Sequence, residues 1–178
     1  MRWRKLLALW ALALLGLVRP AGAADGLGIG SPATAHELEL WDIDIAPNGA
    51  GLPPGQGDAA EGRRVYMQVC ATCHGPSGTE GPMDKLAGGR GTLDSAKPVK
   101  TIGSFWPYAT TLFDYVRRAM PFTQPQSLSN GQVYAVTAYL LHLNGILAED
   151  AVLDAASLPK VQMPNRGGFF PDPRPDVP

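Results

Sequence analysis

Two cysteines and a histidine stand together near the middle of the chain, in the run Cys70-Ala71-Thr72-Cys73-His74. This C-x-x-C-H spacing is the signature of covalent haem attachment, in which each thiol adds to one vinyl group and the histidine becomes the proximal iron ligand. A zinc site would need a second pair of ligands, but the sequence has only two cysteines and no H-x-x-x-H pair. No βαβ pattern supports a thioredoxin-like redox pair. We therefore expect one covalent haem c on Cys70, Cys73 and His74.

A single proximal histidine leaves the opposite face of the iron open for a distal ligand. Met120 has the best context, because it precedes a proline in a short loop between two predicted helices. Met163, also followed by proline, is the alternative, and Met83 and His142 rank behind it. For each methionine, the simpler explanation is packing in an apolar core. Ligation by His and Met raises the reduction potential relative to stronger donors and fills the last iron position, so it favours electron transfer over substrate chemistry.

Three hydrogen-bond donors lie in or just beyond the loop that follows the motif: Arg90, Trp106 and Tyr108. Residues 75–106 are rich in Gly and Pro, and such a long irregular stretch is unusual in a domain without a ligand. Around a haem the stretch is reasonable, because the macrocycle supplies the apolar core that the loop lacks. The three donors are therefore candidates for contacts to the haem propionates, although a structural role is the simpler explanation for each of them alone.

The first predicted helix leads directly into the haem motif. Asp58 is a favourable N-cap residue, so the helix should begin near it and run to the motif. Gly62, Tyr66 and Cys70 recur at a spacing of four, which places them on one face of this helix. A residue as small as Gly62 permits another helix to approach closely, and Tyr66 should pack in the same contact.

Two further helices are predicted after the Gly/Pro-rich loop. Residues 110–119 carry an apolar stripe, and Pro121 ends the helix. The final helix has the clearest signals, because Ser129 and Gln132 form a capping box and an Asn-Gly pair at 144–145 forms a stop. We therefore expect an all-α fold, with helices around one covalently bound haem and extended irregular arms at both ends.

The N-terminal arm contains signals for local order. A short helix is predicted over residues 35–40, with Thr34 as its N-cap. Trp41, Ile43 and Ile45 then alternate with acidic residues, which is typical of an extended segment that packs one apolar edge. A flexible leader is the alternative.

The C-terminal arm combines prolines with large apolar residues. One helical candidate covers residues 149–156, and six prolines follow. Composition alone would allow a flexible tail. The apolar residues instead predict an ordered arm that lies on its own body or on a partner; these are Leu158, Val161, Met163, Phe169 and Phe170.

The first 23 residues have the features of a secretory signal peptide. A basic start precedes an apolar run over residues 6–18 and an A-x-A-like cleavage site at 21–23. The run is shorter than the ~20 residues that span a membrane, so we expect no membrane span after cleavage. An uncleaved anchor is the alternative. Export to the periplasm would place the chain where covalent haem assembly is plausible.

The charge of the chain argues against one class of partner. Residues 1–23 hold four of the 15 basic residues and none of the 16 acidic ones, which leaves a net charge of −5 on the rest. Binding to nucleic acid needs a basic surface that neutralises phosphates. Nucleic acid is therefore not an expected partner.

The order of these features resembles a class I cytochrome c. That family shows a helix into C-x-x-C-H, a Gly/Pro-rich haem loop, a helix ending near a Met-Pro pair, and a final helix that crosses the first. We predict four segments: a signal peptide (1–23), an irregular N-terminal arm (24–56), a cytochrome c domain (57–147) and a Pro-rich C-terminal arm (148–178).

Further stretches resemble the SoxD-like cytochrome c subunits of the sulfite and sulfane dehydrogenases of the Sox sulfur-oxidation pathway. These stretches are residues 41–55, 102–110, 120–145 and 158–166. In that family a periplasmic molybdenum-cofactor subunit oxidises the sulfur substrate, and the electrons pass to the haem of the cytochrome subunit. The resemblance implies two partners, a molybdenum-cofactor dehydrogenase subunit and a downstream cytochrome or oxidase.

The sequence departs from some SoxD-like chains, which carry a second haem domain, because it has a single C-x-x-C-H. The resemblance therefore implies a periplasmic mono-haem cytochrome that accepts electrons from the molybdenum subunit and passes them to the respiratory chain. No catalytic site of its own is expected. Two alternatives are a free periplasmic electron shuttle, and a small haem peroxidase or gas-binding protein with an open distal site.

Overall fold

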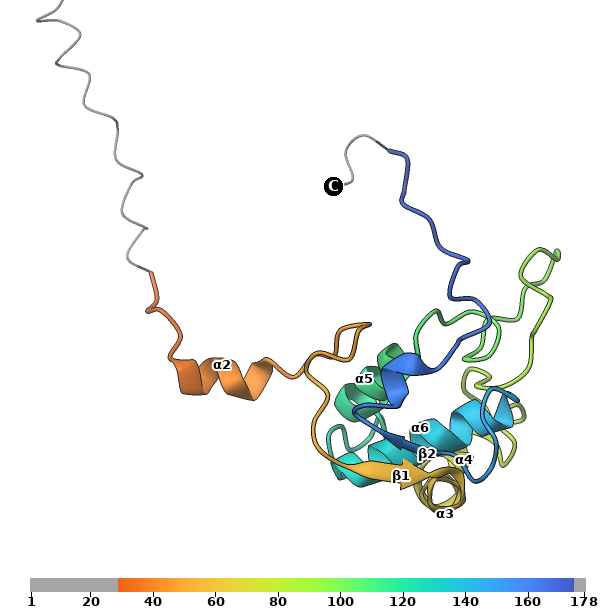
Figure 1. The fold of residues 1–178 in the computed structure, drawn as a ribbon, viewed down its shortest axis with the longest axis horizontal. Helices are drawn as coiled ribbons and strands as arrows, with labels where there is room; N and C mark the ends of the chain where they lie inside the picture. Colours follow the sequence, from red (N-terminus) through yellow and green to blue (C-terminus); the bar gives the residue numbers. More distant parts are fainter. Residues whose placement is uncertain (1–28, 175–178) are drawn as a thin grey trace, which may run out of the picture. The chain divides into compact units, whose positions relative to one another are not determined.

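The structure is a computed structural model that describes residues 29–174 (Figure 1). The signal peptide predicted over residues 1–23 lies outside these residues. The chain divides into two compact units, the first ending at Trp41 and the second beginning at Asp42. Within the described part of the chain, no helix combines the length and the apolar character that crossing a membrane requires.

The ordered element of the first unit is helix α2 (Ala35–Trp41). Its N-terminus is closed by a reciprocal pair of hydrogen bonds: Thr34 Oγ1 accepts from the Glu37 amide at 3.2 Å, and Glu37 Oε2 accepts from the Thr34 amide at 2.8 Å. Such a pair satisfies two backbone donors that a helix start would otherwise leave unpaired. The helix predicted over residues 35–40, with Thr34 as its cap, is therefore confirmed.

In the second unit, helix α3 (Ala59–Val69) begins at the predicted cap, because Asp58 Oδ1 accepts from the Glu61 amide at 2.8 Å. It crosses α6 (Asn130–Leu143), and Figure 1 shows α3 end-on while α6 runs across the page. Gly62 lies at the crossing, where a Cβ atom would stand 1.9 Å from the carbonyl oxygen of Ala135. Only glycine fits there, and the close approach expected at Gly62 is confirmed.

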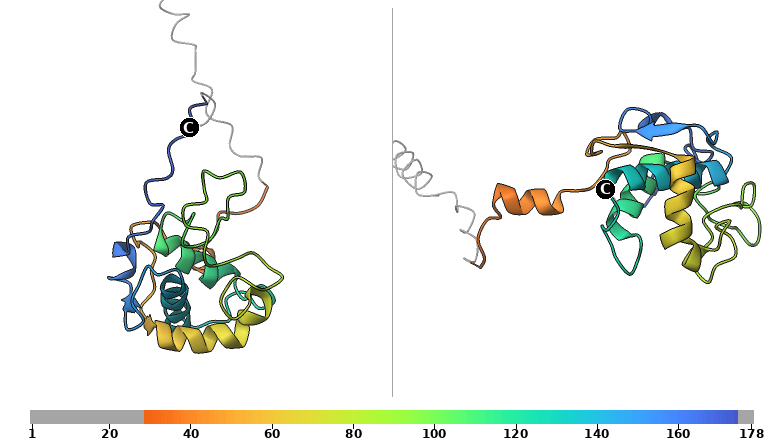
Figure 2. Two further views of the ribbon diagram at one scale, coloured as in Figure 1. Left: turned by 90° about the vertical axis from the view of Figure 1, so that its right-hand side faces the viewer. Right: turned by 90° about the horizontal axis from the view of Figure 1, so that it is seen from below.

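Helix α6 is the centre of the core. Its predicted capping box is present, since Ser129 Oγ accepts from the Gln132 amide at 3.3 Å and Gln132 Oε1 accepts from the Ser129 amide at 2.8 Å. Helix α5 (Ala109–Ala119) packs against it, with the rings of Phe113 and Tyr134 centred 4.4 Å apart. The second view in Figure 2 shows α5, α6 and α3 gathered in one body. The predicted class, an all-α fold of helices packed in one domain, is confirmed for the described residues apart from one small sheet.

A small sheet adds to this helical core. Strands β1 (Gln56–Asp58) and β2 (Val152–Asp154) run antiparallel, with Gly57 opposite Leu153. The helical candidate at residues 149–156 is therefore wrong. Residues 152–154 pair instead with residues 56–58, which are far away in sequence. This long-range pairing overrides a weak local helix signal. Leu153 is buried in the core as a result.

The C-terminal arm is ordered and lies on its own body. After the 3-10 turn η1 (Leu158–Lys160), Leu158, Val161 and Met163 are all buried in the hydrophobic core. Asn165 Nδ2 then donates to the carbonyl oxygen of Phe105 at 2.7 Å. A flexible tail over residues 158–165 is thus excluded. Of the two ordered alternatives, the one in which the arm lies on its own body holds for this part of the chain.

Two of the three residues predicted to form an apolar edge, Ile43 and Ile45, contact α5 at the start of the second unit, whereas Trp41 ends helix α2. Ile45 is buried, and its amide donates to Asp114 Oδ1 of α5 at 3.0 Å. Ile43 is half-buried, and its carbonyl oxygen accepts from Arg117 at 3.1 Å. The apolar edge expected of this segment therefore begins at Ile43. Between the motif and α5, residues 75–108 form turns and coil, as their Gly and Pro content predicted.

Candidate haem-binding site

The haem motif is presented by a break between two helices. Cys70 lies between α3 and the single turn α4 (Ala71–His74). The carbonyl oxygen of Cys70 accepts from the amides of Cys73 at 3.1 Å and His74 at 3.0 Å, so the turn is closed within the motif itself. Cys70 is half-buried and Cys73 is exposed. Both thiols and the imidazole are thereby held on one short, internally bonded turn.

The orientation of His74 is set by backbone further along the chain. Its Nδ1 atom lies 2.9 Å from the carbonyl oxygen of Asp84. Because a carbonyl can only accept, Nδ1 must carry the proton, and the lone pair of Nε2 is then available to a metal ion. This is the arrangement in which a hydrogen bond on the far nitrogen fixes the ring of a metal-binding histidine.

The loop after the motif folds back against it. Tyr66 is fully buried, and its hydroxyl donates to the carbonyl oxygen of Gly75 at 2.7 Å. The amide of Met83 donates to the carbonyl oxygen of Cys73 at 3.0 Å. At Gly81 a Cβ atom would stand only 2.1 Å from that same carbonyl, so the loop can return only because this residue is glycine. These contacts place the Asp84 carbonyl beside His74.

Motif, loop and helices enclose a cavity of about 610 Å³. One side holds Cys70, Cys73 and His74, and Met120 also lines it. Much of the remaining wall is apolar, and the apolar wall residues include Leu86, Ile102, Leu112, Val116, Val136 and Leu140. A covalently bound haem requires two thiols for attachment, donors for the iron and an apolar space for the ring. The cavity provides the two thiols, an imidazole with a free nitrogen, a thioether and an apolar wall. The residues present therefore fit a haem.

The structure brings some predicted site residues together and leaves others apart. Trp106 lines the cavity with the motif and Met120, and its ring meets that of Tyr115 edge-on at 5.7 Å. Met83 also lines the cavity. Met163, by contrast, is not a wall residue and is buried in the core.

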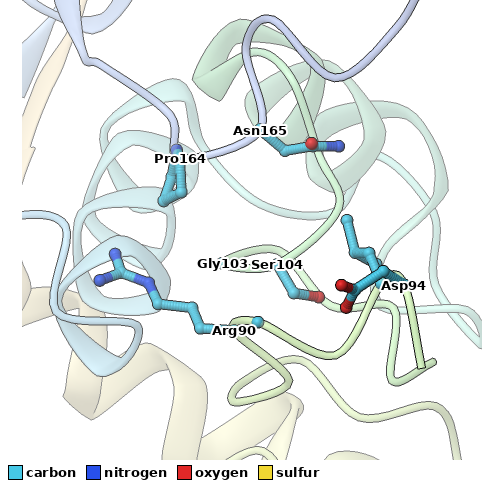
Figure 3. A pocket seen from close by; sticks show the side chains of 8 residues that line it. Arg90, Asp94, Gly103, Ser104, Pro164 and Asn165 are labelled. Carbon is cyan, nitrogen blue, oxygen red and sulfur yellow. The ribbon is translucent and has the colours of Figure 1, made fainter. Parts of the chain in front are cut away.

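Arg90 and Tyr108 are not wall residues of this cavity either. Arg90 lines a separate cavity of about 260 Å³ beside the C-terminal arm, with Asp94 and Asn165 among its neighbours (Figure 3). The ring of Tyr108 faces the guanidinium group of Arg166 at 5.2 Å.

Sequence reasoning missed several wall residues. Tyr115 belongs to the apolar stripe of α5, and that stripe was the only signal that it faces the site. Lys100 and Thr101 line the cavity from the coil before Ile102, where no periodic pattern marks them. The Asp84 carbonyl is a backbone group, which side-chain motifs cannot reveal.

Burial governs the titration of the two groups nearest the motif. Desolvation raises the pKa of the Cys70 thiol to about 11, and the neighbouring Cys73 adds to the effect. Desolvation also raises the pKa of Tyr66, so its hydroxyl stays protonated as the donor to Gly75. In the loop, the Ser77 hydroxyl donates to Glu80 and is the main reason that the pKa of this carboxyl is lowered.

Comparisons with known proteins agree with this geometry. The family described as cytochrome c matches residues 59–144. A chain in the crystal structure of the sulfane dehydrogenase SoxCD from Paracoccus pantotrophus is 46% identical, with a TM-score of 0.77; the match covers 84% of this chain and 74% of that one. Curated proteins gave no significant match.

Proposed function

This chain belongs to the cytochrome c family and carries covalently bound haem c, and we propose that it accepts electrons from a molybdenum-containing sulfite or sulfane dehydrogenase subunit. The observation that carries this proposal is the 46% identity to a chain of sulfane dehydrogenase SoxCD over 84% of the sequence. That span is about 150 residues, compared with the 86 residues that match the cytochrome c family. The similarity therefore extends well beyond what haem binding alone requires.

Haem c supplies one-electron chemistry at a potential that its ligands and surroundings set. In this chain, Cys70 and Cys73 would anchor the group through thioether bonds. His74 would bind the iron through Nε2, and its Nδ1–H bond to Asp84 would keep the imidazole oriented and raise its basicity. We propose Met120 as the distal ligand, because it lines the cavity whereas Met163 does not. Met83 also lines the cavity, but its amide bonds to the Cys73 carbonyl and it adjoins Asp84, which places it in the loop beside the proximal His74. The apolar wall would exclude water from the iron.

The chain would be exported by residues 1–23, act in the periplasm, and pass its electrons to a downstream cytochrome or oxidase of the respiratory chain. Residues 57–147 would form the redox domain, and the flanking arms would serve the complex. With His74 and Met120 both bound to iron, the chain would have no position for substrate, so the sulfur chemistry would take place on the partner subunit.

Co-purification tests the partnership. The chain is expressed with an affinity tag in a host that oxidises reduced sulfur compounds, and the eluate is analysed for protein mass and for molybdenum. We expect a second chain that contains molybdenum at a fixed ratio to haem. Haem-loaded chain that elutes alone, without molybdenum, while the host retains the dehydrogenase activity would contradict the proposal.

A further inference from the structure

One lysine lines the haem cavity without an acidic partner. Lys100 belongs to the coil before Ile102, and it contributes to the cavity wall together with Thr101 and Trp106. None of the ion pairs found within residues 29–174 includes Lys100. We infer that Lys100 supplies the positive charge that faces the haem propionates, and that it thereby raises the reduction potential of the haem.

The propionates of a haem need such a partner in this cavity. They are two carboxylates on a ring that lies against a largely apolar wall, and a carboxylate in such surroundings is costly unless a cation or hydrogen-bond donors meet it. Among the described residues that line the cavity, Lys85 and Lys100 are the lysines, and none is an arginine. Arg90, a candidate for this role from the sequence, lines the separate cavity of Figure 3 instead. Two lysines therefore remain.

The way in which haem is attached favours one of the two lysines. The vinyl groups that react with the cysteines occupy one half of the haem ring, and the propionates occupy the other half. The thioether bonds therefore direct the propionates away from the C-x-x-C-H motif. Lys85 follows Asp84, whose carbonyl oxygen lies 2.9 Å from Nδ1 of His74, so Lys85 belongs to the loop that lies against the motif.

The coil that carries Lys100 is anchored independently of the motif. The hydroxyl of Thr101 donates to the carbonyl oxygen of Gly88 at 2.6 Å, and the amide of Thr101 donates to Ser104 Oγ at 2.8 Å. Thr101 is buried, and its hydroxyl proton is already used in this bond. Lys100 is thus the cation that this part of the wall offers to a carboxylate.

The ammonium group of Lys100 is held in place by an aromatic ring. Its Nζ atom lies 4.9 Å from the centre of the Phe105 ring, which is a cation–π contact. The C-terminal arm supports this ring, because Phe169 meets it edge-on at 5.2 Å and Asn165 Nδ2 donates to the Phe105 carbonyl oxygen at 2.7 Å. An aromatic face carries no net charge, so the ammonium group keeps its full charge and further N–H donors for a carboxylate.

The charge of Lys100 fixes the direction of its effect on the haem. Oxidation of the haem iron adds one positive charge, so a nearby cation disfavours the oxidised form. Propionates without a partner would favour the oxidised form, and Lys100 offsets their charge. Both effects raise the reduction potential. Because Lys100 is exposed, salt should weaken its contribution.

Lys100→Gln tests the inference in the full-length, haem-loaded chain. The variant is compared with wild type at the solution potential at which wild-type haem is half reduced. We expect the ratio of reduced to oxidised haem to fall by about threefold, which corresponds to a potential lower by ~28 mV at 59 mV per tenfold change. The resonance Raman band of the propionate bending motion should also shift, because the carboxylates lose a hydrogen-bond donor.

Lys97→Gln is the matched control. Lys97 is an exposed lysine three positions before Lys100, and it is not a wall residue of the cavity. K97Q removes the same charge from the same coil, and it should leave both the ratio and the propionate band as in wild type. An equal fall of the ratio in K97Q and K100Q would show only an effect of net charge and would overturn the inference. A propionate band that is identical in K100Q and wild type would overturn it as well. The measurement needs only the haem-loaded chain, so its outcome is independent of the proposed dehydrogenase partner.

Discussion

The Nδ1 atom of His74 lies 2.9 Å from the carbonyl oxygen of Asp84, ten residues further along the chain. The orientation of the proximal ligand therefore depends on the path of the loop between the two residues and not on any single side chain. The same loop is held at Met83, whose amide donates to the Cys73 carbonyl at 3.0 Å. Substitutions that displace this loop should therefore change the properties of the haem iron even though they alter no residue that binds it.

Gly81→Ala tests this coupling. A Cβ atom at residue 81 would stand 2.1 Å from the Cys73 carbonyl, so the loop must move away. We expect a loss of about 1–3 kcal/mol in the free energy of unfolding. The reduction potential should rise, because a weaker Nδ1–H bond makes His74 a poorer donor to ferric iron. Gly167→Ala, where a Cβ meets nothing within 4 Å, is the control for thermal melting and potentiometry. An unchanged potential in G81A would contradict the coupling.

Tyr66→Phe removes the hydroxyl that donates to the Gly75 carbonyl at 2.7 Å. Tyr66 is fully buried, and the Gly75 carbonyl then keeps only its longer hydrogen bond from the Gly78 amide at 3.2 Å, so we expect a loss of about 0.5–1.5 kcal/mol. Chemical denaturation of the haem-loaded chain measures the change. Tyr115→Phe is a suitable control, because Tyr115 is 47% exposed and its hydroxyl remains accessible to water. Equal stability of Y66F and wild type would show that the hydrogen bond contributes nothing.

The pH dependence of stability should contain a contribution from Asp154. Hydrogen bonds from the Ser157 amide and hydroxyl, at 2.7 and 2.8 Å, lower the pKa of this carboxyl. A carboxyl whose pKa is lower in the folded state stabilises the fold above its unfolded pKa, and this contribution disappears as pH falls through the folded pKa. Asp154→Asn should therefore melt below wild type at neutral pH, and the difference should shrink by about pH 3. A constant difference across this range would exclude the effect.

The distal ligand can be assigned by comparing two methionine substitutions. Met120 lines the haem cavity, whereas Met163 is buried in the core away from it. Met120→Leu should abolish the methionine–iron absorption band, lower the reduction potential and admit carbon monoxide to the reduced iron. Met163→Leu should keep the band and change stability by less than about 1.5 kcal/mol, as for an exchange of similar volume. Loss of the band in M163L alone would reverse the assignment.

Much of the fold follows from local chemistry that the sequence displays. Asp58, Thr34 and Ser129 all cap helices as their residue types predict. The spacing of Gly62 and Tyr66 identifies the face of α3 that meets α6. These features can be predicted from the sequence because each depends on residues within one or two turns of a helix.

The rest depends on contacts that no local pattern encodes. Strand β2 exists because Leu153 pairs with Gly57 across most of the domain. Asn165 reaches Phe105 over a separation of 60 residues. Arg90 carries a donor suited to a propionate, yet the loop turns it toward a different cavity. For this reason, residue type predicted the haem-attachment motif better than it predicted which more distant side chains line the haem cavity.

The proposed function is tested most directly by measuring whether haem in this chain takes electrons from a sulfur-oxidising molybdenum enzyme. Oxidised full-length chain is mixed with the purified dehydrogenase subunit, and sulfite or protein-bound sulfane sulfur is added while haem absorbance is recorded. We expect reduction of one haem per chain with at least one of these substrates, and no reduction when the dehydrogenase is omitted. Haem that stays oxidised with both substrates, while the same dehydrogenase reduces an artificial acceptor, would contradict it.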